Sequence, residues 1–131
     1  MKRAMVITAI TVALVLAAGI TVLATHWKAP AEAKKIQNPV KPTAASIDRG
    51  RLLFVNSCAK CHGPKALGDG PVVGSLRTQG GMNLTILGTE TDGEIFWKIS
   101  MGRVEMPPWE LVLKSEDRWH IVNYLRTLTK K

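Results

Sequence analysis

The chain has 131 residues, with 18 Lys or Arg against 10 Asp or Glu and a formal net charge of +8. Most of this excess lies before residue 46, where six basic residues accompany a single acidic one, Glu32. The basic residues form no patch interleaved with aromatic residues, so the charge does not indicate nucleic-acid binding. The length leaves room for one small folded domain, and no internal repeat occurs.

An uncharged, apolar run from Ala4 to Thr25 follows the opening Met-Lys-Arg. About 20 apolar residues suffice for a helix that spans a membrane. A cleaved signal peptide has a shorter apolar region, of roughly 7–15 residues, before a small-residue cleavage site. The length therefore predicts an uncleaved transmembrane anchor over residues 1–25. The alternative is cleavage, since Val22–Ala24 would serve as such a site.

Residues 26–45 are rich in Pro, Ala and Lys and contain few large apolar side chains. This composition does not favour packing into a core. It predicts an extended, semi-rigid linker that, at about 3 Å per residue, would reach roughly 60 Å. Trp27 either places its indole at a membrane interface or is simply the first residue of this linker.

Three helices are expected in residues 46–131, which form the folded domain. The first begins with Ser46 as its N-cap. The second starts at Thr91, which forms a capping-box pattern with Glu94, and it stops at Gly102.

The third helix begins with Ser115 as its N-cap and has acidic residues in its first turn and lysines at its end, an arrangement that suits the helix dipole. Its apolar positions recur with helical spacing. They are Trp119, Ile121, Val122, Tyr124, Leu125 and Leu128. The connecting segments are rich in glycine and show no alternating strand pattern. The predicted class is all-α, with long loops.

Both cysteines of the chain lie in one short motif, Cys58-Ala-Lys-Cys61-His62. A zinc site would need a fourth ligand, but His26 and His120 do not form a second closely spaced pair. A dithiol redox site would accompany a βαβ pattern, which is absent. The C-x-x-C-H spacing is specific for covalent haem attachment, because one helical turn presents both thiols and the imidazole to the same macrocycle. We therefore predict one haem c, and this use of both cysteines leaves none for a disulfide.

The sixth position of a haem iron would be filled by Met106, which lies between two predicted helices and precedes Pro107 and Pro108. The prolines fix the backbone and favour an extended conformation at Met106, as a rigid ligand loop requires. The other candidates are Met82, Met101, His120 and His26, or an open site.

Four stretches, "CAKCHG", "GDGP", "FWKISMGRVEMPPW" and "RWHIVNYLRTL", resemble in this order the signatures of class I monohaem c-type cytochromes. The resemblance is greatest to the membrane-anchored cytochromes of bacterial respiratory systems. It covers Ser46 to Leu128 and implies the small class I cytochrome c fold, in which three to five helices and their loops wrap one covalent haem.

The resemblance also implies roles for individual residues. His62 would be the proximal iron ligand and Met106 the distal one. The carbonyl of Pro71 would accept the Nδ1 proton of His62 and so fix the orientation of the ring. In the helices, Gly50 and Phe54 would meet Trp119 or Tyr124, and Gly50 would allow a close crossing.

The resulting expectation is a carrier of single electrons between membrane respiratory complexes, and not an enzyme. His/Met ligation would raise the reduction potential and fill both axial positions. Two alternatives stay open: a haem subunit of a larger membrane complex, and a haem enzyme or gas sensor with a displaceable sixth ligand. The expected partners are redox proteins and a membrane, with no nucleic acid.

The expected location is the cytoplasmic membrane, with the haem domain on its periplasmic, extracytoplasmic side. The positive-inside rule alone would keep the lysines of the linker in the cytoplasm. Thioether haem attachment takes place outside the cytoplasm, however, and we give this the greater weight.

Overall fold

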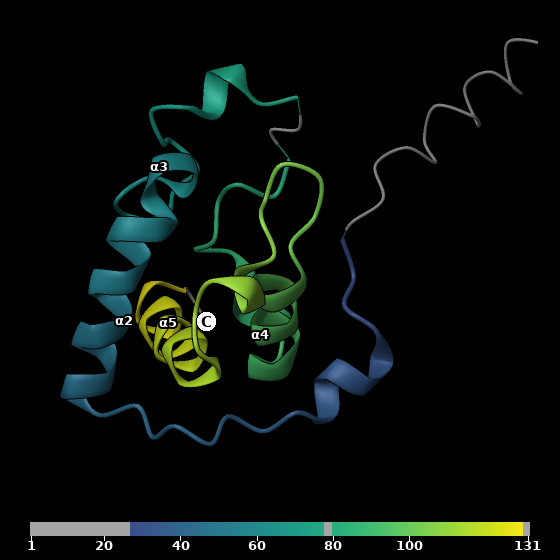
Figure 1. Cartoon of the computed structure of the whole chain (residues 1–131), viewed down its shortest axis with the longest axis vertical. Helices are drawn as coiled ribbons and strands as arrows, with labels where there is room; N and C mark the ends of the chain where they lie inside the picture. Colours follow the sequence, from purple (N-terminus) through teal and green to yellow (C-terminus); the bar gives the residue numbers. More distant parts are fainter. Residues whose placement is uncertain (1–26, 78–79, 130–131) are drawn as a thin grey trace, which may run out of the picture.

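The computed structural model of the chain describes residues 27–77 and 80–129 (Figure 1). This part contains four α-helices and, in place of strands, two isolated bridges. The helices are α2 (Ala44–Ser57), α3 (Ala59–His62), α4 (Asp92–Met101) and α5 (Ser115–Leu128). The 3-10 helices are η2 (Ala31–Lys35), η3 (Val73–Ser75), η4 (Leu87–Thr89) and η5 (Trp109–Leu111). The prediction of an all-α class is confirmed for the described residues.

The most extensive helix contact joins α2 to α5 and is centred on Gly50. A Cβ atom at Gly50 would collide with the backbone carbonyl of His120, so the two helices touch backbone to backbone. One turn further along α2, the ring of Phe54 packs on Tyr124 with centroids 5.4 Å apart. Gly50 and Phe54 thus contact the last helix at Tyr124, one of the two residues expected there. The other, Trp119, packs on α4.

The hydrophobic core lies between α2, α4 and α5. Trp119 stacks on Phe96 of α4, with centroids 3.8 Å apart and planes 9° from parallel. Five of the six residues in the predicted apolar stripe of α5 are buried, and Leu128 packs against them. Periodicity therefore predicted the core-facing side of this helix correctly.

Thr43, and not Ser46, caps the N-terminus of α2. Its hydroxyl oxygen accepts a hydrogen bond from the Ser46 amide at 3.2 Å, so the helix begins two residues before the predicted cap. Ser46 instead faces α5, where its hydroxyl lies 2.8 Å from Nδ1 of His120 and accepts a hydrogen bond from Asn123. The prediction was wrong because either hydroxyl fits a cap locally and only the packing of α5 chooses between them.

The other helix ends agree more closely with the sequence. The capping box of Thr91 and Glu94 is present, and α4 ends at Gly102 as expected. The backbone and hydroxyl of Thr91 both donate to the Glu94 carboxylate, which lowers the pKa of that carboxyl group. Helix α5 does begin at Ser115, but its N-cap position is Lys114, without a side-chain cap.

Residues 27–43, which we call the strap, run across the surface of the domain rather than away from it (Figure 1). Ala33 is almost fully buried, and η2 packs on α4. Gly93 makes this contact possible, because a Cβ atom there would collide with the Ala33 carbonyl and lie 2.6 Å from the Ile36 oxygen. The prediction of an extended tether is therefore wrong for these residues.

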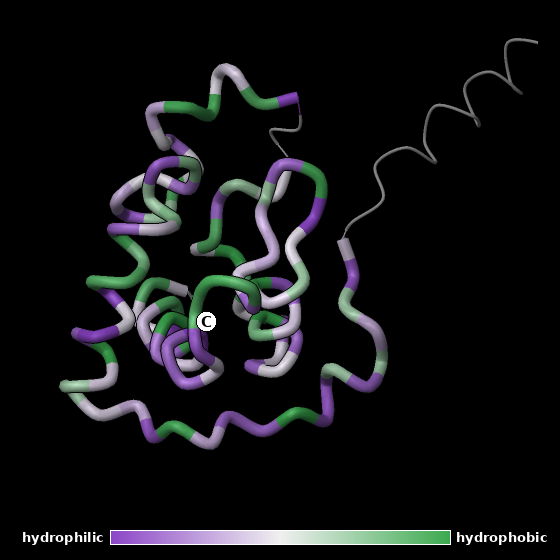
Figure 2. The backbone as a smooth tube through the Cα atoms, viewed as in Figure 1, coloured by the Kyte–Doolittle hydropathy of each residue, from purple (hydrophilic) through white to green (hydrophobic). Residues whose placement is uncertain are grey.

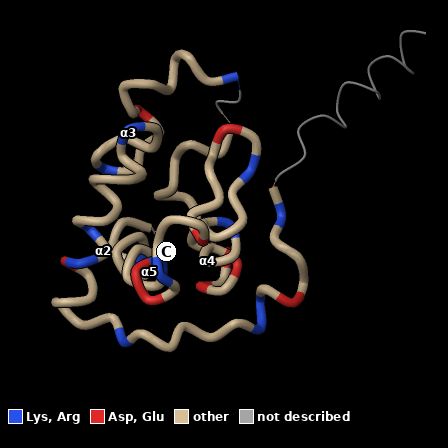
Figure 3. Tube along the Cα trace, viewed as in Figure 1, with Lys and Arg blue, Asp and Glu red and all other residues tan. Residues whose placement is uncertain are grey.

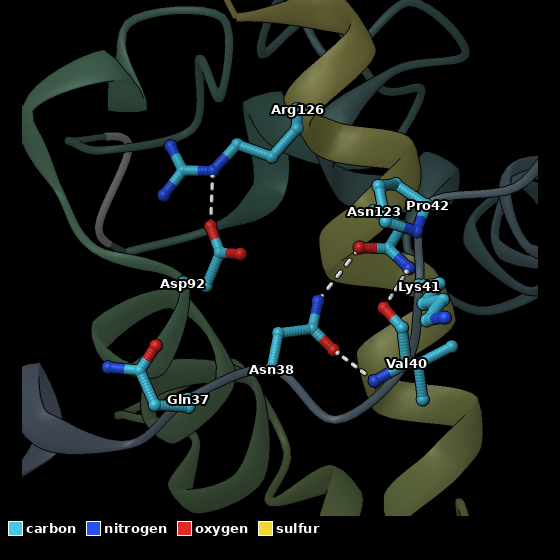
Figure 4. Close-up of a pocket in the computed structure, with 8 residues that line it drawn as sticks. All are labelled: Gln37, Asn38, Val40, Lys41, Pro42, Asp92, Asn123 and Arg126. Carbon is cyan, nitrogen blue, oxygen red and sulfur yellow. Dashed lines mark hydrogen bonds and ion pairs between the residues drawn. The ribbon is translucent and has the colours of Figure 1, made fainter.

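Hydrogen bonds hold the second half of the strap. Asn38 donates to the side-chain oxygen of Asn123 at 2.8 Å, and Asn123 donates to the Val40 carbonyl at 3.0 Å (Figure 4). Beneath these bonds lies an open cleft of about 340 Å³, where Arg126 pairs with Asp92. Hydrophilic and hydrophobic residues are interspersed along the strap (Figure 2). Its attachment to the domain therefore depends on polar hydrogen bonds and on small apolar contacts such as that of Ala33.

No helix among residues 27–77 and 80–129 is long and apolar enough to span a membrane. The apolar run Ala4–Thr25 and His26 lie outside the described residues. The expectation of an N-terminal anchor therefore stays a prediction.

Replacing Gly93 by valine should release the strap, because the new side chain must displace backbone atoms at residues 33 and 36. Overpacking of this kind costs about 1–3 kcal/mol. We expect trypsin to cleave the variant after Lys34 or Lys35 several-fold faster than the parent chain.

Gly74→Val is the matched control, since a Cβ atom at Gly74 meets no atom within 4 Å. It should be cleaved in the strap at the parent rate. An unchanged cleavage rate in Gly93→Val would contradict the docked position of the strap.

Candidate functional site

The Cys58–His62 motif forms a single helical turn directly after α2. Cys58 continues the hydrogen bonding of α2, since its amide donates to the Phe54 carbonyl at 2.8 Å. The amides of Cys61 and His62 then donate to the Cys58 carbonyl, at 3.1 and 2.9 Å. Both cysteines are half-buried, and neither is in a disulfide. The turn therefore presents two thiols and an imidazole in the compact arrangement that the spacing predicts.

The protonation states of these groups follow from their burial. Burial raises the pKa of the Cys58 thiol to about 12, and the neighbouring Cys61 adds to this. Burial also lowers the pKa of His62, while its hydrogen bond to the Met82 carbonyl acts in the opposite direction. At neutral pH the imidazole is therefore uncharged, which is the form that binds metals.

The ring of His62 is oriented by the carbonyl of Met82, at 2.8 Å from Nδ1. In the neutral ring Nδ1–H donates this bond and Nε2 keeps a free lone pair, so Nε2 is the atom available to a metal. The resemblance implied that the Pro71 carbonyl would play this part. The structure corrects that assignment in favour of Met82.

Met82 rather than Pro71 reaches His62 because the segments around these two residues are held by different parts of the fold. A Cβ atom at Gly70 would collide with the Cys61 carbonyl, and the Val72 amide donates to the Lys60 carbonyl at 3.3 Å. The segment around Pro71 therefore lies against the backbone of α3.

The Met82 segment is brought to the imidazole by two contacts further along the chain. Leu67 bridges to Asn83, and the Leu84 amide donates to the Ala66 carbonyl at 2.8 Å. Gly68 is the one residue in the sequence that could have indicated that the Met82 backbone lies close by. A Cβ atom at Gly68 would lie 3.0 Å from the Met82 carbonyl carbon. That indication is weak, because glycine is abundant throughout these loops.

Met106 lies on a tight loop after α4. The backbones of Arg103 and Met106 exchange two hydrogen bonds, both 2.9 Å long. Gly102 begins the loop with φ of +62°, and a Cβ atom there would collide with the Met106 carbonyl. Only glycine accommodates both the conformation and the close approach.

Met106 packs against the buried hydrophobic core, and Cys58 and Ala59 of the motif pack against the same cluster. The motif and Met106 thus border the same core, as do other residues such as Val40 and Leu128. This is the surrounding that a covalently held haem would need, and these residues fit it: Cys58 and Cys61 would attach it, and His62 and Met106 would ligate its iron.

The remaining candidate ligands have other positions. His120 belongs to α5, and its ring is hydrogen-bonded to Ser46 of α2. Met101 is 46% exposed at the end of α4. Met82 contributes its backbone carbonyl to His62.

Arg118 is a buried charged residue for which the sequence gave no indication. Its guanidinium lies 4.8 Å from the Phe96 ring centroid and donates to Ser100, while its Nε is buried without a hydrogen-bond partner in the described structure. Burial lowers its pKa, and the charge of Glu110 partly offsets this effect. Arg118 therefore joins α5 to α4. The nearby negative charge comes from Glu110 of η5, which follows the Met106 loop.

Comparisons with known proteins agree with this geometry. A sequence model of the family described as cytochrome c oxidase, cbb3-type, subunit III, matches residues 45–125, which is more than half of the chain. A search of curated proteins found no match.

Among solved structures, a chain of the reducing HAO-like protein complex of Kuenenia stuttgartiensis is similar, with a TM-score of 0.63 and 22% sequence identity. The match covers 72% of this chain and 50% of that one, so the present chain corresponds to about half of it. At this identity the likeness shows the fold alone.

The importance of the Met82 carbonyl can be tested through Gly68. Gly68→Ala should push the Met82 backbone away from His62 and weaken their hydrogen bond. Because this bond makes the imidazole a more basic ligand, we expect a more positive reduction potential in the haem-loaded protein.

Gly81→Ala is the control, since Gly81 also has a positive φ, of +77°, but its Cβ would meet no atom within 4 Å. It should lose about 1 kcal/mol of stability from backbone strain alone and keep the parent potential. Equal potentials in both variants would contradict a role for the Met82 carbonyl.

Proposed function

Since the chain belongs to the family described as subunit III of cbb3-type cytochrome c oxidase, we propose that it carries single electrons through one haem c ligated by His62 and Met106. The observation that carries the proposal is the C-x-x-C-H motif, folded as one helical turn that packs against the same core as the Met106 loop. Haem iron supplies the one-electron chemistry.

The residues of this chain would serve that function by holding the haem, orienting its ligands and shielding it. Cys58 and Cys61 would fix the haem to the end of α2, and the Met82 carbonyl would hold the ring plane of His62. With His62 and Met106 both bound to the iron, no position would remain for a substrate, and such ligation would raise the reduction potential. We therefore propose a carrier rather than an enzyme.

A second candidate, the haem subunit of a larger membrane oxidoreductase, is favoured by the docked strap. A free shuttle needs a linker that lets the domain travel, whereas the strap is fixed to α4 and α5. The subunit description of the family points the same way. In either case the partners are redox proteins.

Electron transfer requires the partner to approach the haem attachment site closely. Lys60 and Lys65 next to the motif and Arg103 beside Met106 are all exposed and basic. They would favour an acidic partner surface and give a rate of electron transfer that falls with ionic strength.

We also propose that the apolar run Ala4–Thr25 anchors the chain in the cytoplasmic membrane, with the haem domain outside the cytoplasm. The support is the length of the run and the extracytoplasmic site of thioether attachment.

Met106→Ala tests the ligation. The haem-loaded variant should lose the near-red absorption band of sulfur-ligated ferric haem and should bind carbon monoxide in the ferrous state. Met101→Ala is the matched control, since this methionine is exposed, and it should keep the band. Retention of the band in Met106→Ala would overturn the assignment.

Covalent attachment is tested by acid–acetone extraction. The parent chain should retain its haem through extraction and on a denaturing gel stained for haem. Replacement of both Cys58 and Cys61 by serine should make the haem fully extractable, whereas either single replacement should retain one thioether. Extraction of haem from the parent would be incompatible with the proposal.

A further inference from the structure

The strap determines where the N-terminal part of the chain leaves the domain. Trp27, the first described residue, packs on Trp97 of α4 with ring centroids 6.3 Å apart. The ammonium of Lys98 lies 5.5 Å from the centroid of the Trp27 ring. The chain therefore enters the domain at α4, held by an aromatic pair and a cation.

Sequence distance then limits how far α4 can lie from the proposed anchor. The apolar run ends at Thr25, two residues before Trp27. Each residue spans at most about 3.6 Å, so Trp27 lies within roughly 7 Å of the end of that run. A free linker would have separated the domain from the membrane, but a docked strap does not.

The surface next to this entry point has the chemistry of a membrane-contact face. Indole rings are favoured at the boundary between hydrocarbon and water. Lysines follow along the strap, with one acidic position among them (Figure 3), and the side chain of Lys34 is 63% exposed even though it approaches Glu94 at 3.9 Å. The exposed lysines of the first half of the strap are Lys28, Lys34 and Lys35, against one exposed acidic residue, Glu32. The acidic residues of α4 are paired, Asp92 with Arg126 and Glu94 with Lys34. Basic residues close to a membrane are attracted to anionic lipids.

We propose that the side of the domain formed by the first half of the strap and α4 rests on anionic lipid headgroups. This rests on the proposed anchoring by Ala4–Thr25. The packing order gives the domain a defined orientation, because η2 lies on α4, α4 on α5, and α5 on α2. Helix α2 lies on the opposite side of the domain from α4 (Figure 1) and in this orientation would face away from the bilayer.

The experiment compares two positions in the haem-loaded full chain, whose own cysteines are engaged by the haem. A single cysteine is introduced as Ala31→Cys in the strap or as Leu52→Cys on the half-exposed face of α2, and is labelled with a nitroxide. Each protein is placed in vesicles of anionic lipid containing a small fraction of nickel-chelating lipid. Nickel relaxes only labels that are close to the headgroups.

We expect the label at position 31 to be relaxed several-fold more than the label at position 52. Lys28→Glu with Lys35→Glu should reduce this difference, whereas the control pair Arg51→Glu with Lys114→Glu, also at exposed sites, should leave it unchanged. Equal relaxation in a chain that sediments with the vesicles would overturn the orientation and leave the anchor standing. A chain that does not sediment with them would overturn both proposals.

Discussion

The crossing of α2 and α5 at Gly50 is the constraint on which the rest of the fold depends. No side chain separates the two backbones there, since a Cβ atom would collide with the His120 carbonyl. Because α2 continues directly into the Cys58 turn, the crossing also fixes the thiols relative to the core. The same helix α5 receives α4 through Trp119 and Phe96, and α4 leads into the Met106 loop. A shift at Gly50 would thus move the two halves of the site relative to each other.

The site is made by loops whose close approaches depend on glycine backbone geometry. Gly68 allows the Met82 segment to reach His62, and Gly102 allows the chain to fold back over Met106. Both have positive φ values, which other residues adopt only with strain. Each loop is held at both ends by α3, α4 or α5, so local strain is supported by the packed helices. Neither ligand side chain depends on a long, unsupported segment.

Local signals in the sequence predicted most of the fold. The capping box at Thr91, the buried face of α5 and the helical turn at the motif each depend on residues within a few positions of one another. Apart from the one-residue shift of the α5 N-cap to Lys114, the errors involve contacts between distant segments. Ser46 faces α5 rather than capping α2, and Met82 replaces Pro71 beside His62. The linker prediction failed for the same reason, since counting large apolar residues overlooks a small buried residue that fits over a glycine of α4. The loop position of Met106 before two prolines, together with the family resemblance, predicts its distal role, and the structure adds that Met106 and Cys58 pack on one cluster.

The docked strap would limit how far the proposed anchored electron carrier can reach. An extended segment of this length, at about 3 Å per residue, would let the domain search for partners up to roughly 60 Å away. The same residues fixed by Trp27, Ala33 and Asn38 hold the domain beside its point of entry. Because electron transfer falls steeply with distance, a carrier held in this way depends on a partner that brings its own redox centre to the domain. That requirement is met most simply when the partner is a fixed neighbour in the same membrane assembly.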